Sequence, residues 1–218
     1  MAGYVIYSLD WHKFCAMIEY PTPSQLAIFS DSVAEELENM EGEFDDDDPI
    51  LDWPTAADSL SSVVADRLAR ADWYSDLSEQ GRQLWESAFY VACMRSEDLN
   101  LDFRVDSDGV YWDVINHIVR QLGDRPEKPG NSAMSLFGTV PYRCSAPPRK
   151  DKRSYWTSMH SMHPPDEVHR MLTELRKVAP VIETVKDEGV REQFCDELLP
   201  AIERVAKDGR LLFVQVDT

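Results

Sequence analysis

Two apolar runs with β-strand character stand near the two ends of the chain, and they decide the class of fold. Leu211 to Val216 is apolar enough for the centre of a sheet, and Gly3 to Ser8 alternates and is rich in Tyr, Val and Ile. A third alternating segment, Asp102 to Asp106, leads into a turn signal at Gly109. Long helical patterns separate these strands without regular alternation. We therefore predict an α+β fold, with several amphipathic helices packed on a small mixed sheet that includes the N- and C-terminal strands.

Helix start signals divide the rest of the chain. The run from Thr22 to Gln25 combines Thr at the N-cap, Pro at N1 and Gln at N3, so it predicts a helix that reaches about Met40. Thr55 begins a second helix, and Ser78 caps a third. A further amphipathic helix is predicted to begin near Pro165.

Two prolines fall inside the apolar helical patterns near the C-terminus. A Pro in a helix interior removes one hydrogen bond and clashes with the preceding turn. Pro180 is therefore expected to kink or split the helix that begins near Pro165. Pro200 is expected to interrupt the last helix, which ends at Asp208-Gly209.

No convincing linker divides the chain, so a single α+β domain is predicted over residues 1–218. It includes an acidic loop near 41–54 and a basic, Pro-containing loop near 143–154. The basic loop leaves three interpretations open: a salt contact within the chain, a head-to-tail contact with a partner, or a site for an anionic ligand. No Gly-rich phosphate loop accompanies it, which makes the last interpretation the weakest.

Negative charge is concentrated in one part of the sequence. The net charge is −18, and the segment from Asp31 to Asp58 holds twelve Asp or Glu and no Lys or Arg. Its most acidic run consists of Asp45, Asp46, Asp47 and Asp48. This run is a candidate binding segment for a basic protein partner. It lacks the alternating carboxylates of a calcium site, and the overall acidity disfavours nucleic acid as a partner because phosphate contacts need clustered Lys and Arg.

The composition predicts a cytoplasmic globular protein without a membrane partner. No apolar run reaches the roughly 18 residues of a membrane-spanning helix, and the N-terminus lacks the features of a signal peptide. The four cysteines lie far apart and form no Cys-x-x-Cys pair. Cys15, Cys93 and Cys195 fall in apolar helical contexts, where a thiol is typically a small buried side chain.

Three of the five histidines gather between Tyr155 and His169. A zinc site could use His160, His163 and His169, with a neighbouring carboxylate. Their spacing matches no known finger or helical pattern, so neither a metal nor a cofactor is predicted. General acid–base chemistry would instead pair His160 or His163 with a carboxylate.

The same stretch also fits a purely structural role. In that interpretation Trp156, Met159 and Met162 pack inward, while the histidines cap the next helix or face solvent. His169 falls on the polar face of that helix by its phase. No nucleophile motif such as G-x-S-x-G is present, so a hydrolase is permitted but not indicated.

A second candidate site lies on a helix predicted between Val110 and Leu122. Asp113 and His117 are four residues apart, so the carboxylate can orient the imidazole on one helix face. Trp112 and His117 lie on either edge of the apolar face. Most pairs of this kind are ordinary surface contacts, so this one becomes a site only if it meets the later histidines across a cleft.

Several features occur in a familiar order. They are an opening strand, a Trp-bearing helix with a nearby His (Tyr111 to Val119), a Gly-containing segment, a helix start at Pro164 to Val168, and a closing strand led by Gly209. This order is similar to that of the YfbM-like group of small bacterial proteins of unknown function. The resemblance implies an α+β cytosolic bacterial protein and no established activity.

Two functional hypotheses follow. The leading one is a non-enzymatic acidic interaction protein, of an immunity or regulatory type, that binds a protein partner. The alternative is a small-molecule binding protein or hydrolase with a Trp/His cleft. The cleft would be formed by Trp112, His117, Trp156, His160 and His163. The sequence leaves open whether the protein is an enzyme.

Overall fold

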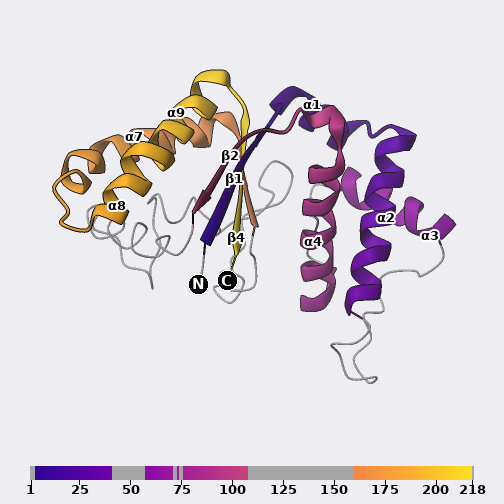
Figure 1. Ribbon diagram of the computed structural model, residues 1–218. Helices are drawn as coiled ribbons and strands as arrows, with labels where there is room; N and C mark the ends of the chain where they lie inside the picture. Colours follow the sequence, from indigo (N-terminus) through magenta and orange to yellow (C-terminus); the bar gives the residue numbers. More distant parts are fainter. Residues whose placement is uncertain (1–2, 41–56, 71–72, 74–75, 108–159, 218) are drawn as a thin grey trace. The chain divides into compact units, whose positions relative to one another are not determined.

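The computed structural model describes residues 3–40, 57–70, 73, 76–107 and 160–217 (Figure 1). These residues fall into two compact units. The sheet unit contains the described residues of 1–11 and 101–218, and the inserted unit contains those of 12–100. The single domain expected over 1–218 stays a prediction, and each unit is described by itself.

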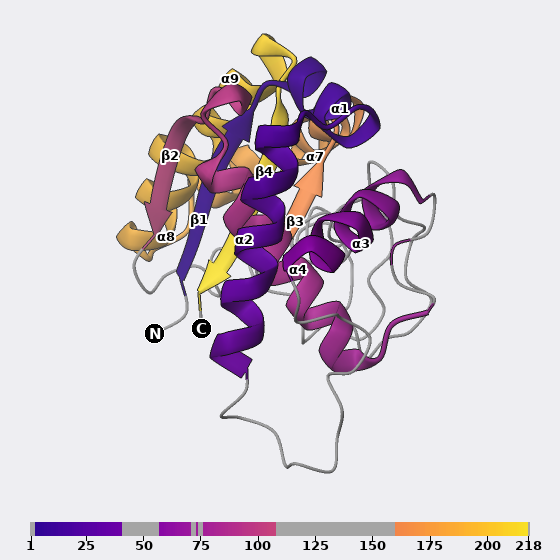
Figure 2. The same ribbon diagram turned by 90° about the vertical axis from the view of Figure 1, so that its right-hand side faces the viewer.

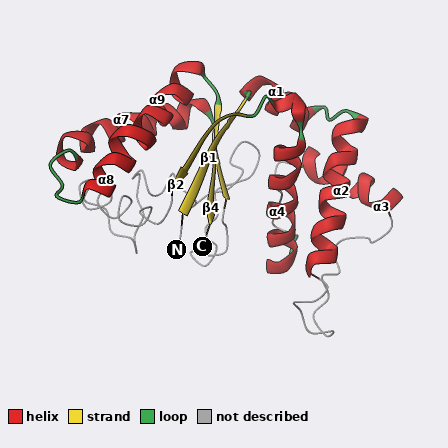
Figure 3. Ribbon diagram, viewed as in Figure 1, coloured by secondary structure: helices red, strands yellow, loops and turns green. Residues whose placement is uncertain are grey.

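The sheet unit is built on a four-stranded sheet in the order β2-β1-β4-β3. The strands are β1 (Gly3–Leu9), β2 (Asp102–Ser107), β3 (His160–His163) and β4 (Leu211–Asp217). Together with the helices they confirm the predicted α+β class (Figure 3). All three pairings between described strands are antiparallel, where a mixed sheet was expected.

The closing strand β4 lies between β1 and β3, which confirms its predicted central place. Gly3 pairs with Asp217 and Leu9 pairs with Leu211, so the first and last strands run side by side over their whole length (Figure 2). The short strand β3 was not predicted. Its four residues His-Ser-Met-His give no apolar alternation, and only pairing with Leu212 to Gln215 defines it as a strand.

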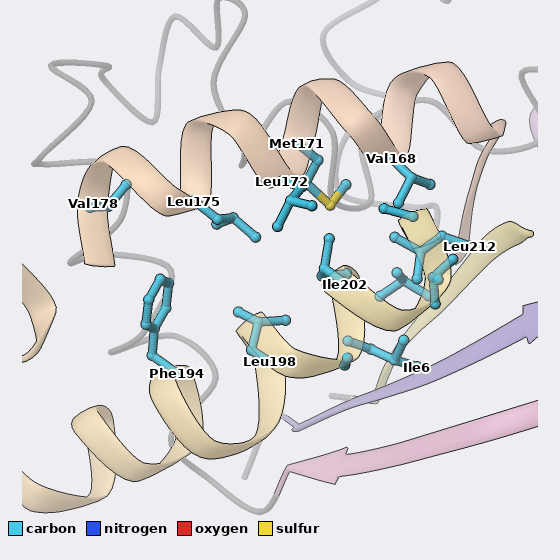
Figure 4. Packing of buried hydrophobic residues seen from close by; sticks show 14 of the residues in the cluster. Ile6, Val168, Met171, Leu172, Leu175, Val178, Phe194, Leu198, Ile202 and Leu212 are labelled. Atoms are coloured by element: carbon cyan, nitrogen blue, oxygen red, sulfur yellow. The ribbon is translucent and has the colours of Figure 1, made fainter. Parts of the chain in front are cut away.

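Helices cover one face of this sheet (Figure 1). They are α7 (Pro165–Ile182), α8 (Glu188–Glu192), the π-helical turn η3 (Gln193–Leu198) and α9 (Leu199–Asp208). Figure 4 shows side chains of α7, such as Leu175, directed at those of η3 and α9, such as Leu198 and Ile202. Ile6 and Leu212 contribute the sheet side of this core. Its apolar burial is the main force that holds the helices on the sheet.

The two prolines act differently. Pro180 lies inside α7 without splitting it, because it falls in the last turn and removes only one bond near the helix end. Pro200 interrupts the last helix, as predicted. It follows the π-helical turn η3, where the N–H of Leu199 donates to the carbonyl of Phe194, five residues back. Because Pro200 has no N–H to donate, the regular helical pattern is interrupted here, and the chain forms this wider turn.

The inserted unit is helical. Its elements are α1 (Trp11–Glu19), α2 (Pro23–Met40), α3 (Ala57–Ala69), α4 (Glu79–Arg95) and the 3-10 turn η1 (Glu97–Leu99). Its core is strongly aromatic. Phe29, Trp73 and Trp85 surround Phe89 with ring centroids 5.0–5.8 Å from it, and all four side chains are buried.

Two of the predicted helix caps are present, and the third, at Thr55, lies outside the described residues. The Thr22 N–H donates to Oε1 of Gln25 at 2.9 Å, and the Gln25 N–H donates to Oγ1 of Thr22 at 3.3 Å, which closes the predicted capping box. The Ser78 side chain accepts from the N–H of Gly81 at 3.1 Å. These local bonds fix the starts of α2 and α4.

Candidate functional site

Most of the residues singled out in the sequence lie outside the described residues. They are Asp45, Asp46, Asp47, Asp48, Trp112, Asp113, His117 and Trp156. His160 is the first residue of β3 and pairs with Gln215, but its side chain is not described. The expected cleft between Trp112, His117 and the later histidines therefore stays a prediction.

His163 is the candidate whose surroundings are best described. It ends β3 opposite Leu212, on the sheet face covered by α7, and its side chain is 0% exposed. Its Nδ1 atom lies 3.5 Å from Oε2 of Glu167, in the first turn of α7. The positive end of the helix dipole favours a carboxylate at that position.

Glu167 connects this buried imidazole to the surface. Its Oε1 atom lies 3.2 Å from a guanidinium nitrogen of Arg170, whose side chain is 59% exposed. The three side chains form a polar connection from the end of β3 through the first turns of α7. Acid–base catalysis requires contact with the substrate, and the His163 imidazole is covered on all sides. The geometry therefore favours a role in attaching α7 to the sheet.

The rest of the histidine stretch agrees in part with the structural interpretation. Met162 is fully buried, as expected, and His169 is exposed on the polar face of α7 with Thr173 and Arg176. His163 does not face solvent, because its position in β3 directs it into the core. Among the described residues, no group of three His, Cys, Asp or Glu is placed to hold a metal ion.

The helix α2 presents an acidic face. Asp31, Glu35 and Glu38 are exposed, and their spacing of four and three residues puts them on one side of the helix. Glu35 lies 2.7 Å from a guanidinium nitrogen of Arg95 in α4. There is no acidic residue in the first turn of α2 and no basic residue in its last turn. The carboxylates are thus gathered toward the negative end of the helix, where the dipole disfavours them.

The excess of negative charge belongs almost entirely to the inserted unit. Residues 12–100 contain 20 Asp or Glu and 5 Lys or Arg, a net charge of −15. The remaining residues contain 20 Asp or Glu and 17 Lys or Arg, a net charge of −3. The sequence alone showed a segment with twelve carboxylates. The boundaries of the inserted unit add that nearly all of the excess negative charge lies in one of the two units.

An arginine cluster in the inserted unit was missed in the sequence. Arg67 is buried and donates to the Trp73 carbonyl at 2.9 Å and to both carboxylate oxygens of Asp76. Arg70 also contacts Asp76. The hydrogen bond from Arg67, against a smaller opposing effect of burial, lowers the pKa of Asp76 to about 2. The cluster attaches the Trp73 backbone and the Asp76 side chain to α3. In the sequence, only the four-residue spacing of Asp66 and Arg70 indicates part of this cluster.

Two of the described cysteines have raised pKa values. Burial, followed by the charge of Glu19, raises the pKa of Cys15. Burial, followed by the charges of Glu183 and Asp196, raises the pKa of Cys195. Cys93 is buried, and none of the three described cysteines forms a disulfide. Since the thiolate is the nucleophile, these positions are poorly suited to covalent catalysis.

Searches against protein-family models, curated proteins and solved structures found no match. Within the described part of the chain, no helix combines the length and the apolar character needed to cross a membrane. The α+β fold is the one that the YfbM-like resemblance implies, and membership of that family stays a prediction.

Proposed function

We propose that the protein is a non-enzymatic interaction protein, and that residues 12–100 carry the acidic surface with which it binds a basic protein partner. The observation that supports this most is the charge of −15 in that unit, against −3 in the rest of the chain. A strong local field of one sign speeds association with a partner of the opposite sign and selects against other partners.

The arrangement on α2 supports a binding role more than a stabilising one. Carboxylates at the negative end of a helix, with no basic residue in its last turn, lower the stability of that helix. Asp31, Glu35 and Glu38 also repel one another on one face, and Arg95 beside Glu35 offsets one of the three charges. Such a distribution is expected where the charge serves recognition. The acidic run Asp45 to Asp48 continues the same segment in the sequence.

A capture experiment with charge-neutralised variants tests the proposal. The full chain with Asp45, Asp46, Asp47 and Asp48 all replaced by Asn is compared with the wild type as bait in extracts of the source organism. We expect a protein that the wild type captures to be lost with this variant, and to be released from the wild type by moderate salt.

A matched control separates the place of the charge from its total. Glu183→Gln, Glu188→Gln, Glu192→Gln and Asp208→Asn together remove the same four charges from exposed positions of the sheet unit. This control should capture the partner as the wild type does. If the Asp45–Asp48 variant captures the same protein equally well, the proposal is wrong.

A further inference from the structure

A cluster of hydrogen bonds closes the sheet where the chain leaves it for the inserted unit and where it returns. The Ser8 hydroxyl, near the end of β1, donates to the carbonyl of Asp102 at the start of β2 at 2.8 Å. Arg210, just before β4, donates from Nε to the same hydroxyl at 2.9 Å and from its terminal nitrogen to the Ser8 carbonyl at 3.1 Å. We call Ser8, Asp102 and Arg210 the root clamp.

All members of the root clamp belong to the sheet unit. Ser8 is buried, and it pairs with Asp102 on one side and with Leu212 of β4 on the other. The backbone of Arg210 is itself held, since its N–H donates to the carbonyl of Val205 in α9 at 3.2 Å. Loss of structure in residues 12–100 would therefore remove none of these bonds.

The chain that joins β1 to β2 also turns sharply at the edge of the sheet unit. Asn100 has φ 48° and ψ 61°, and it is the last residue of the inserted unit. Asn adopts this left-handed conformation more readily than other residues with a side chain. It ends η1, and β2 begins two residues later. The two strands that bracket the insertion are thus antiparallel neighbours that need no part of the insertion to pair.

The charge distribution is expected to lower the stability of the inserted unit more than that of the sheet unit. Its net charge of −15 repels itself in the folded state, whereas the rest of the chain is close to neutral. We infer that the described residues of 12–100 open as one cooperative unit while the sheet stays closed, with the root clamp as the boundary between the two events. This inference concerns the folding of the chain and does not rest on the proposed function.

The root clamp has a specific task in this behaviour. When the inserted unit opens, residues 10–101 become a long flexible loop between β1 and β2, and the entropy of that loop favours separation of the two strands. The bonds of Arg210 and Ser8 oppose the separation at the strand ends. Units that open separately also occur within single domains, so the inference is compatible with one domain over 1–218.

Native-state hydrogen exchange on the full chain, with one destabilising change in each unit, tests the inference. Phe89 and Phe194 are both 0% exposed, one in the core of each unit. Phe89→Ala should speed amide exchange in α2 and α4 by about a hundredfold or more, and change that of β1, β4 and α7 by less than about threefold. Phe194→Ala should do the reverse. Equal acceleration in both units by either variant overturns the inference.

The root clamp is tested in the same experiment. Arg210→Met combined with Phe89→Ala should speed exchange in β1 and β2 about tenfold beyond the product of the two single effects. The entropy of the opened loop then favours separation of the two strands, and the bonds of Arg210 no longer oppose it. Strictly multiplicative effects overturn the role of the clamp.

If Phe89→Ala does not fold, exchange of the wild type in rising concentrations of urea, below those that unfold the chain, tests the separate opening of the two units. The amides of α2 and α4 should then share one opening reaction of lower free energy than that of β4, and one shared reaction for both units overturns the inference.

Discussion

The Nδ1 atom of His163 lies 3.5 Å from the Oε2 atom of Glu167, and this contact joins the last residue of β3 to the first turn of α7. His163→Ala removes a fully buried side chain and leaves the buried carboxylate without the imidazole. We expect the free energy of unfolding to fall by about 3 kcal/mol. Urea unfolding followed by circular dichroism measures the change.

The exposed histidine of the same helix provides the control. His169→Ala removes the same side chain from the polar face of α7 and should change stability by less than about 0.5 kcal/mol. Equal effects of the two variants would contradict the buried, structural role assigned to His163.

Asp76 makes the stability of the inserted unit depend on pH. Its pKa is lowered to about 2 in the folded protein, chiefly by the bond from Arg67, while an unfolded Asp titrates near 3.9. Its contribution is therefore complete above about pH 4 and is lost as the pH falls toward 2. Because the carboxylate is 46% exposed, we expect a contribution on the order of 1 kcal/mol.

The variant Asp76→Asn isolates this contribution from that of the other carboxylates. Urea unfolding should show it less stable than the wild type at pH 6, with the difference shrinking between about pH 4 and pH 2. Asp196→Asn, at an exposed position in the sheet unit, should show no such convergence. A difference in unfolding free energy that stays constant down to pH 2 would mean that the arginines do not lower the pKa of Asp76.

The acidic end of α2 is expected to lower stability, which a pair of variants can show. Glu38→Gln removes a charge near the negative end of α2 and should raise the unfolding free energy by about 0.3–1 kcal/mol. Asp166→Asn removes a charge from the first turn of α7, where the dipole favours it, and should lower stability by a similar amount. Thermal unfolding at low salt compares the two, and changes of the same sign would contradict this view of α2.

The described thiols should react slowly with alkylating reagents. The pKa values of Cys15 and Cys195 are raised, so less thiolate is present at pH 8 than in an unfolded chain. We expect both to react with iodoacetamide more slowly than the same cysteines in urea, and faster as the pH rises above 9. Peptide mapping by mass spectrometry follows each site. A native rate equal to that in urea would rule out the raised values.

The elements that were predicted correctly are those with a local signal. The capping box at Thr22 and the cap at Ser78 need only four consecutive residues, and both helices begin where expected. The closing strand from Leu211 could be placed at the sheet centre because it is apolar on both faces. Each of these predictions depended on residues that are neighbours in the chain.

What could not be predicted depends on contacts between distant residues. Ser8 and Arg210 are 202 positions apart, and nothing near either residue indicates the other. In the structural interpretation the histidines cap the next helix or face solvent, yet the pairing of β3 with β4 turns His163 into the core. The candidate residues at 45–48, 112–117 and 156 lie outside the described residues, so their part in a site stays predicted.

The salt dependence of partner binding shows whether the acidic charge of residues 12–100 drives the interaction. The protein captured by the wild type is purified, and its affinity for three chains is measured by titration calorimetry at low and at about 0.5 M salt. The chains are the wild type, the Asp45–Asp48 variant and the four-charge control in the sheet unit. We predict that the wild type and the control bind alike and lose at least about tenfold in affinity at high salt, while the Asp45–Asp48 variant binds weakly at both. Equal affinities of all three chains, unchanged by salt, would contradict the account.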